Sequence, residues 1–117
     1  MYDAFMIRKE LVAASAEPLI LSLLAKGESY GYAIIQEIKT RSQDQLEWTD
    51  GMLYPVLHRL ERKGHIKSRW AEAENGRKRK YYSVKKEGKE ALNKHQQQWA
   101  IIHGVLAGLQ KEGPQYV

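Results

Sequence analysis

The spacing of the apolar residues changes twice along this chain, and these changes limit the folds that are open to it. Up to about residue 63, apolar residues recur every three or four positions, which is the period of an amphipathic helix. Between residues 66 and 84 they alternate with polar residues on both sides of a polar tip that contains Asn75 and Gly76. This pattern is typical of a β-hairpin. Helical spacing returns after residue 85, so a hairpin between helical segments is predicted.

The first helix is expected to run from Ala4 to Lys26 and to stop at Gly27. Pro18 leaves two alternatives within it. A proline bends a helix when it lies in an interior turn, but it also suits a first turn, in which case Ser15 would cap a second helix. We favour a single bent, continuous helix.

Two more helices are expected before the hairpin. Ser29 can cap one that runs to about Arg41, and Thr49 or Asp50 can cap another that stops at Gly64. Each has an apolar stripe for burial, formed by Ile34, Ile35 and Ile38 in the first and by Leu53, Val56, Leu57 and Leu60 in the second.

The last helix is expected over residues 86–111, with Gly113 and Pro114 ending it. The resulting order is that of a winged helix-turn-helix with an extra terminal helix. A chain of 117 residues is too short for two independent domains. We predict a mainly α fold with a small β-hairpin, divided into a winged helix-turn-helix DNA-binding unit over residues 1–85, a long C-terminal dimerisation helix packed on it over residues 86–112, and a tail over residues 113–117.

The chain is basic, with 19 Lys and Arg against 14 Asp and Glu, a net charge of +5 and a pI near 9.4. This balance favours a polyanionic partner without identifying it. The chain has no cysteine, which excludes disulfides and thiolate chemistry and fits a reduced, cytoplasmic location. No apolar segment is of the signal-peptide or membrane-spanning type, so no membrane association is expected.

The sequence does not indicate an enzyme. It has no glycine-rich phosphate loop, no cluster of carboxylates on one helix face and no serine in a recognisable nucleophile context. We therefore expect no catalytic site, no cofactor and no metal centre.

The second helix of a helix-turn-helix pair enters the major groove with the face opposite its apolar stripe. On this face, Arg59 and Arg62 could contact phosphates or guanine edges. His58 could bond to a base edge and Tyr54 to a phosphate. The alternative is an ordinary solvated polar face. The candidate DNA-contacting residues of this helix are Met52, Tyr54, Pro55, His58, Arg59, Arg62 and Lys63.

Four consecutive cations, Arg77, Lys78, Arg79 and Lys80, follow the hairpin tip at Gly76. Few structural roles require such a run, so these residues are candidates for phosphate contacts from a wing. Strand alternation sends the two arginines to one side and the two lysines to the other. About half of the run is therefore expected to reach DNA at once.

Apolar residues at heptad spacing run along the last helix, and such a seam usually packs against another helix. A symmetric second copy is the expected partner. On the opposite side, small residues such as Ala100, Gly104 and Gly108 would let a helix over residues 5–24 approach closely, so both sides are expected to be buried. The candidate dimer-interface residues are Leu92, Trp99, Ile102, Leu106 and Leu109.

Within this seam, His95, Trp99 and His103 lie four residues apart. Two copies facing each other across a dyad could frame a slot in which Trp99 stacks on a small planar aromatic ligand. The alternative is plain interface packing of Trp99. A shared metal ion is less favoured, because the two histidines lie about 12 Å apart along one helix and would need ligands from a partner.

Three stretches of the sequence together resemble the PadR-like family of transcriptional regulators: SYGYAI at residues 29–34, GMLYPVLHRLE at residues 51–61 and GRKRKYY at residues 76–82. The resemblance extends over residues 15–109. It implies a homodimeric repressor that binds double-stranded DNA and releases its operator when a small molecule binds. The chain is similar to the short branch of the family, which lacks a large separate dimerisation domain.

The resemblance also implies roles for single residues. Gly31 would permit close helix packing, and Trp99 is similar to a terminal-helix tryptophan that lines an interfacial cavity in some multidrug sensors. At Lys85 the chain departs from the family, in which Ser or Thr usually caps the last helix. The positions that would lie at or beside DNA are Ser29, Tyr30, Tyr54, His58 and Arg59, with Gly76, Arg77, Lys78 and Arg79 in the wing.

Two other functions remain open. A non-specific architectural protein on DNA or RNA would keep the basic wing without a defined spacing of half-sites. A helical adaptor would show no salt-dependent DNA binding. A twofold dimer that reads a palindromic operator is instead expected to contact half-sites about 34 Å apart, which is roughly one helical turn.

Overall fold

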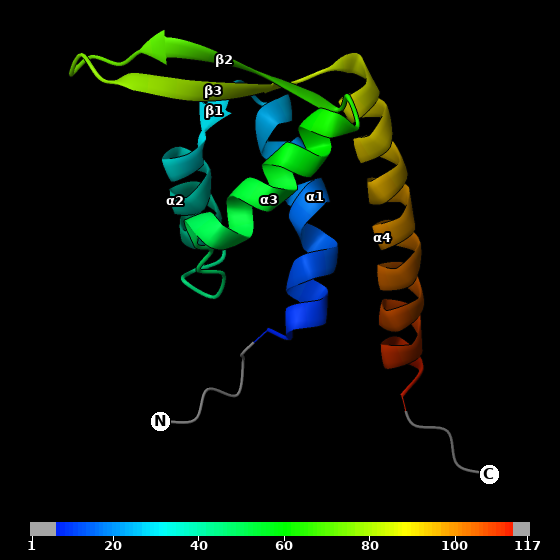
Figure 1. The fold of residues 1–117 in the computed structure, drawn as a ribbon. Helices are drawn as coiled ribbons and strands as arrows, with labels where there is room; N and C mark the ends of the chain where they lie inside the picture. Colours follow the sequence, from blue (N-terminus) through cyan, green and yellow to red (C-terminus); the bar gives the residue numbers. More distant parts are fainter. Residues whose placement is uncertain (1–6, 114–117) are drawn as a thin grey trace.

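The computed structural model describes residues 7–113 (Figure 1). Its elements follow the predicted order, with one additional strand. The sheet lies across one end of the first three helices, and the last helix runs down one side of the molecule (Figure 1). The elements are α1 (Lys9–Ala25), β1 (Ser29–Tyr30), α2 (Gly31–Arg41), α3 (Asp50–Arg62), β2 (Ile66–Glu72), β3 (Lys78–Val84) and α4 (Lys86–Glu112).

The predicted hairpin is confirmed. Strands β2 and β3 pair in antiparallel register from Ile66 opposite Val84 to Glu72 opposite Lys78. At the tip, Gly76 has φ +82°, in the left-handed region that favours glycine. Because β2 and β3 extend beyond the helices that pack beneath them, the far half of the hairpin projects as a wing (Figure 1).

Strand β1 was not predicted. Ser29 pairs with Tyr82 and Tyr30 pairs with Tyr81, so the sheet has the strand order β1-β3-β2. The prediction that Ser29 caps α2 is therefore wrong. Pairing with β3 keeps Ser29 and Tyr30 extended, and α2 begins at Gly31 with no side-chain cap.

Helix α1 is continuous through Pro18, as favoured above. The hydroxyl of Ser15 donates to the carbonyl of Val12, which places Ser15 inside the helix rather than at a cap. The helix begins at Lys9, so the predicted start at Ala4 is wrong at least over residues 7–8. Residues 4–6 lie outside the described part of the chain.

The core lies where the first three helices meet the sheet and the start of α4. Helix α3 begins as predicted, with the Thr49 hydroxyl accepting a hydrogen bond from the backbone N–H of Met52 at 3.2 Å. Gly31 lies under Tyr54, and a Cβ at Gly31 would collide with the tyrosine hydroxyl. The buried core residues are Ala16, Ile20, Leu21, Leu24, Ile34, Ile38, Trp48, Leu53, Val56, Leu57, Leu60, Ile66, Tyr82 and Leu92.

Helix α4 is longer than its partner α1, with 27 residues against 17. The first half of α4 packs on the domain, and Leu92 is buried in the core of the same chain. The prediction that the small-residue side of α4 packs on α1 is wrong. Ala100 and Gly104 are exposed, and α1 lies instead against Gln96 and Trp99.

Candidate nucleic-acid interface

The side of α3 turned away from the core carries Pro55, His58 and Arg62, and all three are exposed. The stripe of Leu and Val residues fixes this orientation, since every buried residue of α3 belongs to that stripe. Pro55 has no N–H to donate to the carbonyl of Gly51, which leaves that acceptor for another donor. This face therefore offers an imidazole and a guanidinium within two helical turns.

Arg59 and Lys63, predicted on the same face, lie on the flank of α3 next to α1. The Arg59 Nε donates to Oε2 of Glu17 at 2.7 Å, and Lys63 Nζ lies 3.2 Å from each oxygen of that carboxylate. Met52, on the same flank, packs against the core. The predicted reading residues of α3 are thus divided between an outward face and a flank tied to α1.

The carboxyl group of Glu17 is largely enclosed, with its side chain 14% exposed. Desolvation raises the pKa of Glu17. Hydrogen bonds from Arg59 and Lys63, together with their positive charges, outweigh that effect, so that the net pKa is lowered from 4.5. Glu17 is therefore ionised at neutral pH.

A hollow of about 470 Å³ separates the wing from the helices. Trp70 of β2 and Tyr32 of α2 line it, and they are 65% and 69% exposed. Exposed apolar surface that is rimmed by polar residues often marks an interaction site. The other lining residues are Tyr30, Gly31, Tyr54, Arg77, Lys78, Arg79 and Lys80.

Strand alternation divides the wing cations as predicted. The guanidinium of Arg79 lies 3.9 Å from the centre of the Tyr30 ring, on the face of the sheet shared with Tyr81. The amine of Lys80 lies on the other face, 5.9 Å from the Trp70 ring. Arg77 and Lys78, at the tip, are exposed.

The wing is joined to α3 beneath the sheet. The hydroxyl of Ser68 on β2 donates to a carboxylate oxygen of Glu61 on α3 at 2.5 Å. The adjacent Tyr82 is 1% exposed, and its hydroxyl has no hydrogen-bond partner within residues 7–113. Burial, followed by the nearby Glu61 and Tyr54, raises the pKa of Tyr82 to about 12. These contacts fix the angle between the wing and the exposed face of α3.

Three residues near the predicted site were missed by sequence reasoning: Tyr32, Trp70 and Glu17. In the alternating pattern of the hairpin, Trp70 falls on the same side of the strand as Ile66, which is a buried position. In the structure, Trp70 lies beyond the point where the helices cover the sheet, so the same face is open to solvent. The pairing of Glu17 with α3 had no sequence signal, since 42 residues separate it from Arg59.

The family of the chain follows from comparison with known proteins. Residues 20–94 match the model of the transcriptional regulator PadR-like family. The chain belongs to the PadR-like family. It is 32% identical to an uncharacterized protein of Lysinibacillus sphaericus over 101 residues, which cover 86% of this chain and 93% of that protein.

Solved structures of similar proteins share the fold of this PadR-like chain. A transcriptional regulator from Clostridium thermocellum has a TM-score of 0.78 at 29% identity, covering 86% of this chain and 97% of its own. A PadR family transcription regulator from Clostridium difficile R20291 has a TM-score of 0.70 at 33% identity, covering 82% and 98%. The chain is thus a transcriptional regulator of the PadR family with a winged-helix fold, as the sequence indicated. These relatives are regulators of transcription rather than enzymes.

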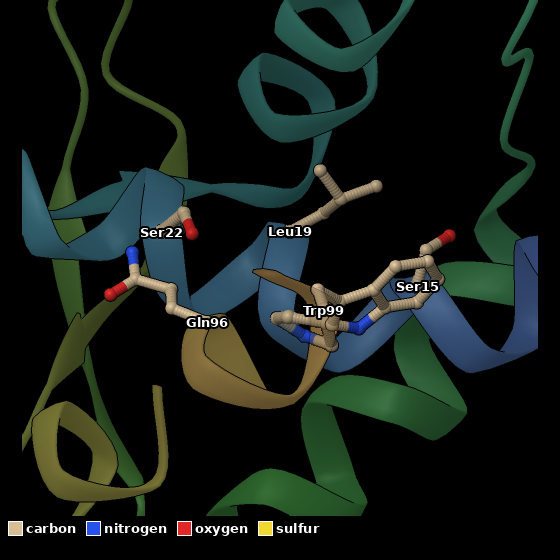
Figure 2. Close-up of a pocket in the computed structure, with 6 residues that line it drawn as sticks. Ser15, Leu19, Ser22, Gln96 and Trp99 are labelled. Atoms are coloured by element: carbon tan, nitrogen blue, oxygen red, sulfur yellow. The ribbon is translucent and has the colours of Figure 1, made fainter. Parts of the chain in front are cut away.

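A second hollow of this PadR-like chain, about 320 Å³ in volume, lies between α1 and α4. Figure 2 shows Trp99 of α4 lying against Ser15 and Leu19 of α1, with Gln96 and Ser22 at the other end. His95 lines a different hollow with His65, and His103 is exposed. One chain therefore brings Trp99 to α1 but does not bring the two predicted histidines to the same hollow. The complete lining of the Trp99 hollow is Ser15, Pro18, Leu19, Ser22, Gln96 and Trp99.

The second half of α4 exposes a continuous set of apolar side chains in the isolated chain. Within one turn of each other, Ile102 is 58% and Leu106 is 63% exposed. The described part of the chain leaves them without cover. The exposed apolar residues of this half are Ile101, Ile102, Val105, Leu106 and Leu109.

Within residues 7–113, no helix has both the length and the apolar character needed to cross a bilayer. Over the same range, no three His, Asp or Glu side chains come together in a way that could hold a metal ion.

Proposed function

We propose that this PadR-like regulator is a homodimeric repressor that binds a palindromic operator in double-stranded DNA and releases it when a small aromatic or drug-like ligand binds. The observation that carries the proposal is the hollow between the basic wing and the start of α2, which Tyr54 of α3 also lines. Helix and wing reach neighbouring grooves of a duplex in winged-helix recognition, and one sugar-phosphate strand separates those grooves. The hollow has the right place and charge to receive that strand.

The side chains around this hollow suit a sugar-phosphate strand. Tyr32 and Tyr54 offer phenolic hydroxyls, and Lys78 and Lys80 offer ammonium groups, all of which bond phosphate oxygens. The exposed ring of Trp70 offers an apolar surface for the sugar. From the same side, His58 and Arg62 would face base edges in the major groove.

The exposed apolar half of α4 supports the homodimer. In one chain, Ile102, Leu106 and Leu109 lie on one side of the helix at heptad spacing and are open to solvent. A second copy related by a twofold axis would cover them and would present two reading surfaces to two half-sites. The predicted separation of those half-sites is about 34 Å.

The hollow at Trp99 supports ligand response. It is lined mainly by apolar atoms, and the indole forms one wall. A planar aromatic molecule could stack on Trp99 there, or between two copies of it across the dimer axis with His95 and His103 nearby. Replacement W99A is expected to weaken the dimer, the binding of an aromatic probe such as acridine, or both.

The test is equilibrium titration of the full chain with its best duplex at several salt concentrations. Variant R62A removes a cation from the exposed face of α3 and K78A removes one from the lining of the hollow, while K39A removes a cation near the far end of α2 as a matched control. We expect R62A to lower operator affinity and K78A to reduce the salt slope by about 0.9. Equal affinity for every duplex would favour the alternative, a non-specific architectural protein. Unchanged binding by both variants would contradict the proposed surface.

A further inference from the structure

The ion pairs of Glu17 differ from the surface ion pairs elsewhere in the chain. One carboxylate from α1 accepts hydrogen bonds from two cations of α3, and its side chain is only 14% exposed. By contrast, Glu37 pairs with Arg41 one turn away on the same helix, and their side chains are 43% and 58% exposed. An exposed pair of that kind contributes little. An enclosed carboxylate that joins two helices restricts its partners much more strongly.

The hydrogen bond to Glu17 leaves part of the Arg59 guanidinium available for a second partner. The hydrogen bond to Glu17 uses Nε, so the edge formed by the two Nη groups remains for a second acceptor. That edge has two N–H donors side by side and can make bidentate contacts with phosphate or guanine. Arg59 therefore presents its second edge in a fixed direction, since the first is held by α1.

Lys63 is held in a different way. Its single charged atom, Nζ, lies 3.2 Å from both oxygens of Glu17, so the carboxylate competes directly with any phosphate for this amine. Together, Glu17, Arg59 and Lys63 carry a net charge of +1 where two free cations would carry +2. Because fewer side-chain cations on this flank are free to contact phosphates, the chain binds DNA of any base sequence less tightly.

From this geometry we infer that Glu17 is a specificity-determining, positioning residue for DNA recognition. It orients Arg59 for one contact and withholds Lys63 from indiscriminate phosphate binding. Its effect is to raise the ratio of operator affinity to non-specific affinity. The inference rests on the proposed function, because it requires that α3 meets duplex DNA.

The experiment measures affinity for the operator and for a scrambled duplex of equal length, at several salt concentrations, with the full chain. In E17Q both cations are released, and each new phosphate contact adds about 0.9 to the salt slope. We expect the non-specific affinity of E17Q to rise, its slope to steepen by about 0.9 to 1.8, and the operator-to-scrambled ratio to fall roughly tenfold. E37Q, the matched control, should behave as the unmodified chain.

Two further variants distinguish a role of Glu17 in positioning Arg59 and Lys63 from a role in packing α1 against α3. When Arg59 and Lys63 are both alanine, E17Q should leave the slope on scrambled DNA unchanged, because no cations remain to be released. E17D keeps the charge and should retain the original slope. If E17Q had the slope and the affinity ratio of the unmodified chain, or weakened both duplexes equally while lowering Tm, the inference would be overturned. Failure of the unmodified chain to bind any duplex would instead overturn the proposed function, and the inference with it.

Discussion

The hydroxyl of Tyr54 on α3 occupies the space in which a side chain at Gly31, the first residue of α2, would begin. This contact packs the Tyr54 side chain of α3 directly against the backbone at the start of α2. It also holds the Tyr54 hydroxyl at the edge of the hollow beside the wing. Gly31 thus has the role in close packing that the family resemblance implied.

Replacing Gly31 by alanine is expected to force Tyr54 away and to lower the free energy of unfolding by about 1–3 kcal/mol, as overpacking does. The control is G51A, also on a helix, where the nearest side-chain atom would lie 3.9 Å from the new Cβ. That change should be neutral or stabilising by up to about 1 kcal/mol. Urea denaturation measures both. Equal stability of G31A and G51A would show that the Tyr54 contact does not constrain the fold.

Trp70 gives a spectroscopic test of the hollow. Of the tryptophans, Trp48 is buried and Trp99 is partly buried, whereas Trp70 is 65% exposed. Operator binding should change the indole emission of the unmodified chain, and W70F should abolish most of that change. W70A should lower operator affinity roughly tenfold, equivalent to about 1.4 kcal/mol of lost contact. An undiminished emission change in W70F would place the DNA elsewhere.

The pKa of Glu17 predicts how stability depends on acidity. Because the pKa in the folded chain is lowered below 4.5, the ion pairs contribute stability above that pH, and this stability is lost as pH falls through the folded value. Measured by urea denaturation, E17Q should be less stable than the unmodified chain at pH 7. The two should converge as the pH falls below 4.5 and the Glu17 carboxylate of the unmodified chain becomes protonated. A constant difference across this range would contradict the ionised pairing.

Tyr82 predicts a loss of stability at high pH. The pKa of Tyr82 in the folded chain is raised to about 12 from 10.0. As the pH rises above 10, the Tyr82 hydroxyl therefore loses its proton in the unfolded chain before it does so in the folded chain. The contribution of this group is therefore complete below pH 10 and is lost as the pH rises towards 12. Y82F cannot ionise, and its Tm should fall less between pH 9 and 11.5. At pH 7, Y82F should not be destabilised, because the buried hydroxyl has no partner within residues 7–113.

The apolar half of α4 predicts the assembly state. Placing a carboxylate at Leu106, 63% exposed in one chain, would bury a charge in the proposed dimer, so L106E should shift the protein to monomers. Sedimentation equilibrium measures the shift, with Q97E on the same helix as the control. A dimer that persists in L106E at micromolar concentration would exclude this face as the interface.

The features predicted correctly are those in which structure follows from neighbouring residues. The Thr49 cap, the apolar stripe of α3 and the turn at Gly76 depend on residues within a few positions of each other, and all three were predicted. The order of helices and hairpin followed from their spacing. The same local rules identified the wing cations and the outward positions of His58 and Arg62.

The features that were not predicted are those in which structure depends on residues far apart in the chain. Pairing of β1 with β3 brings Ser29 to Tyr82 and overrides the capping preference of the serine. Likewise, Arg59 pairs with Glu17 instead of pointing outward, because its flank of α3 packs against α1. The packing of α4 was misjudged because small residues permit close approach without favouring it, whereas Trp99 supplies apolar surface that α1 can cover.

The most direct test of the account is to select genomic duplex fragments with the purified full chain and to footprint the best one. We expect a palindromic site protected by a dimer, with half-sites about 34 Å apart and binding that weakens steeply with salt. Uniform weak protection of all fragments, with no repeated half-site, would contradict it.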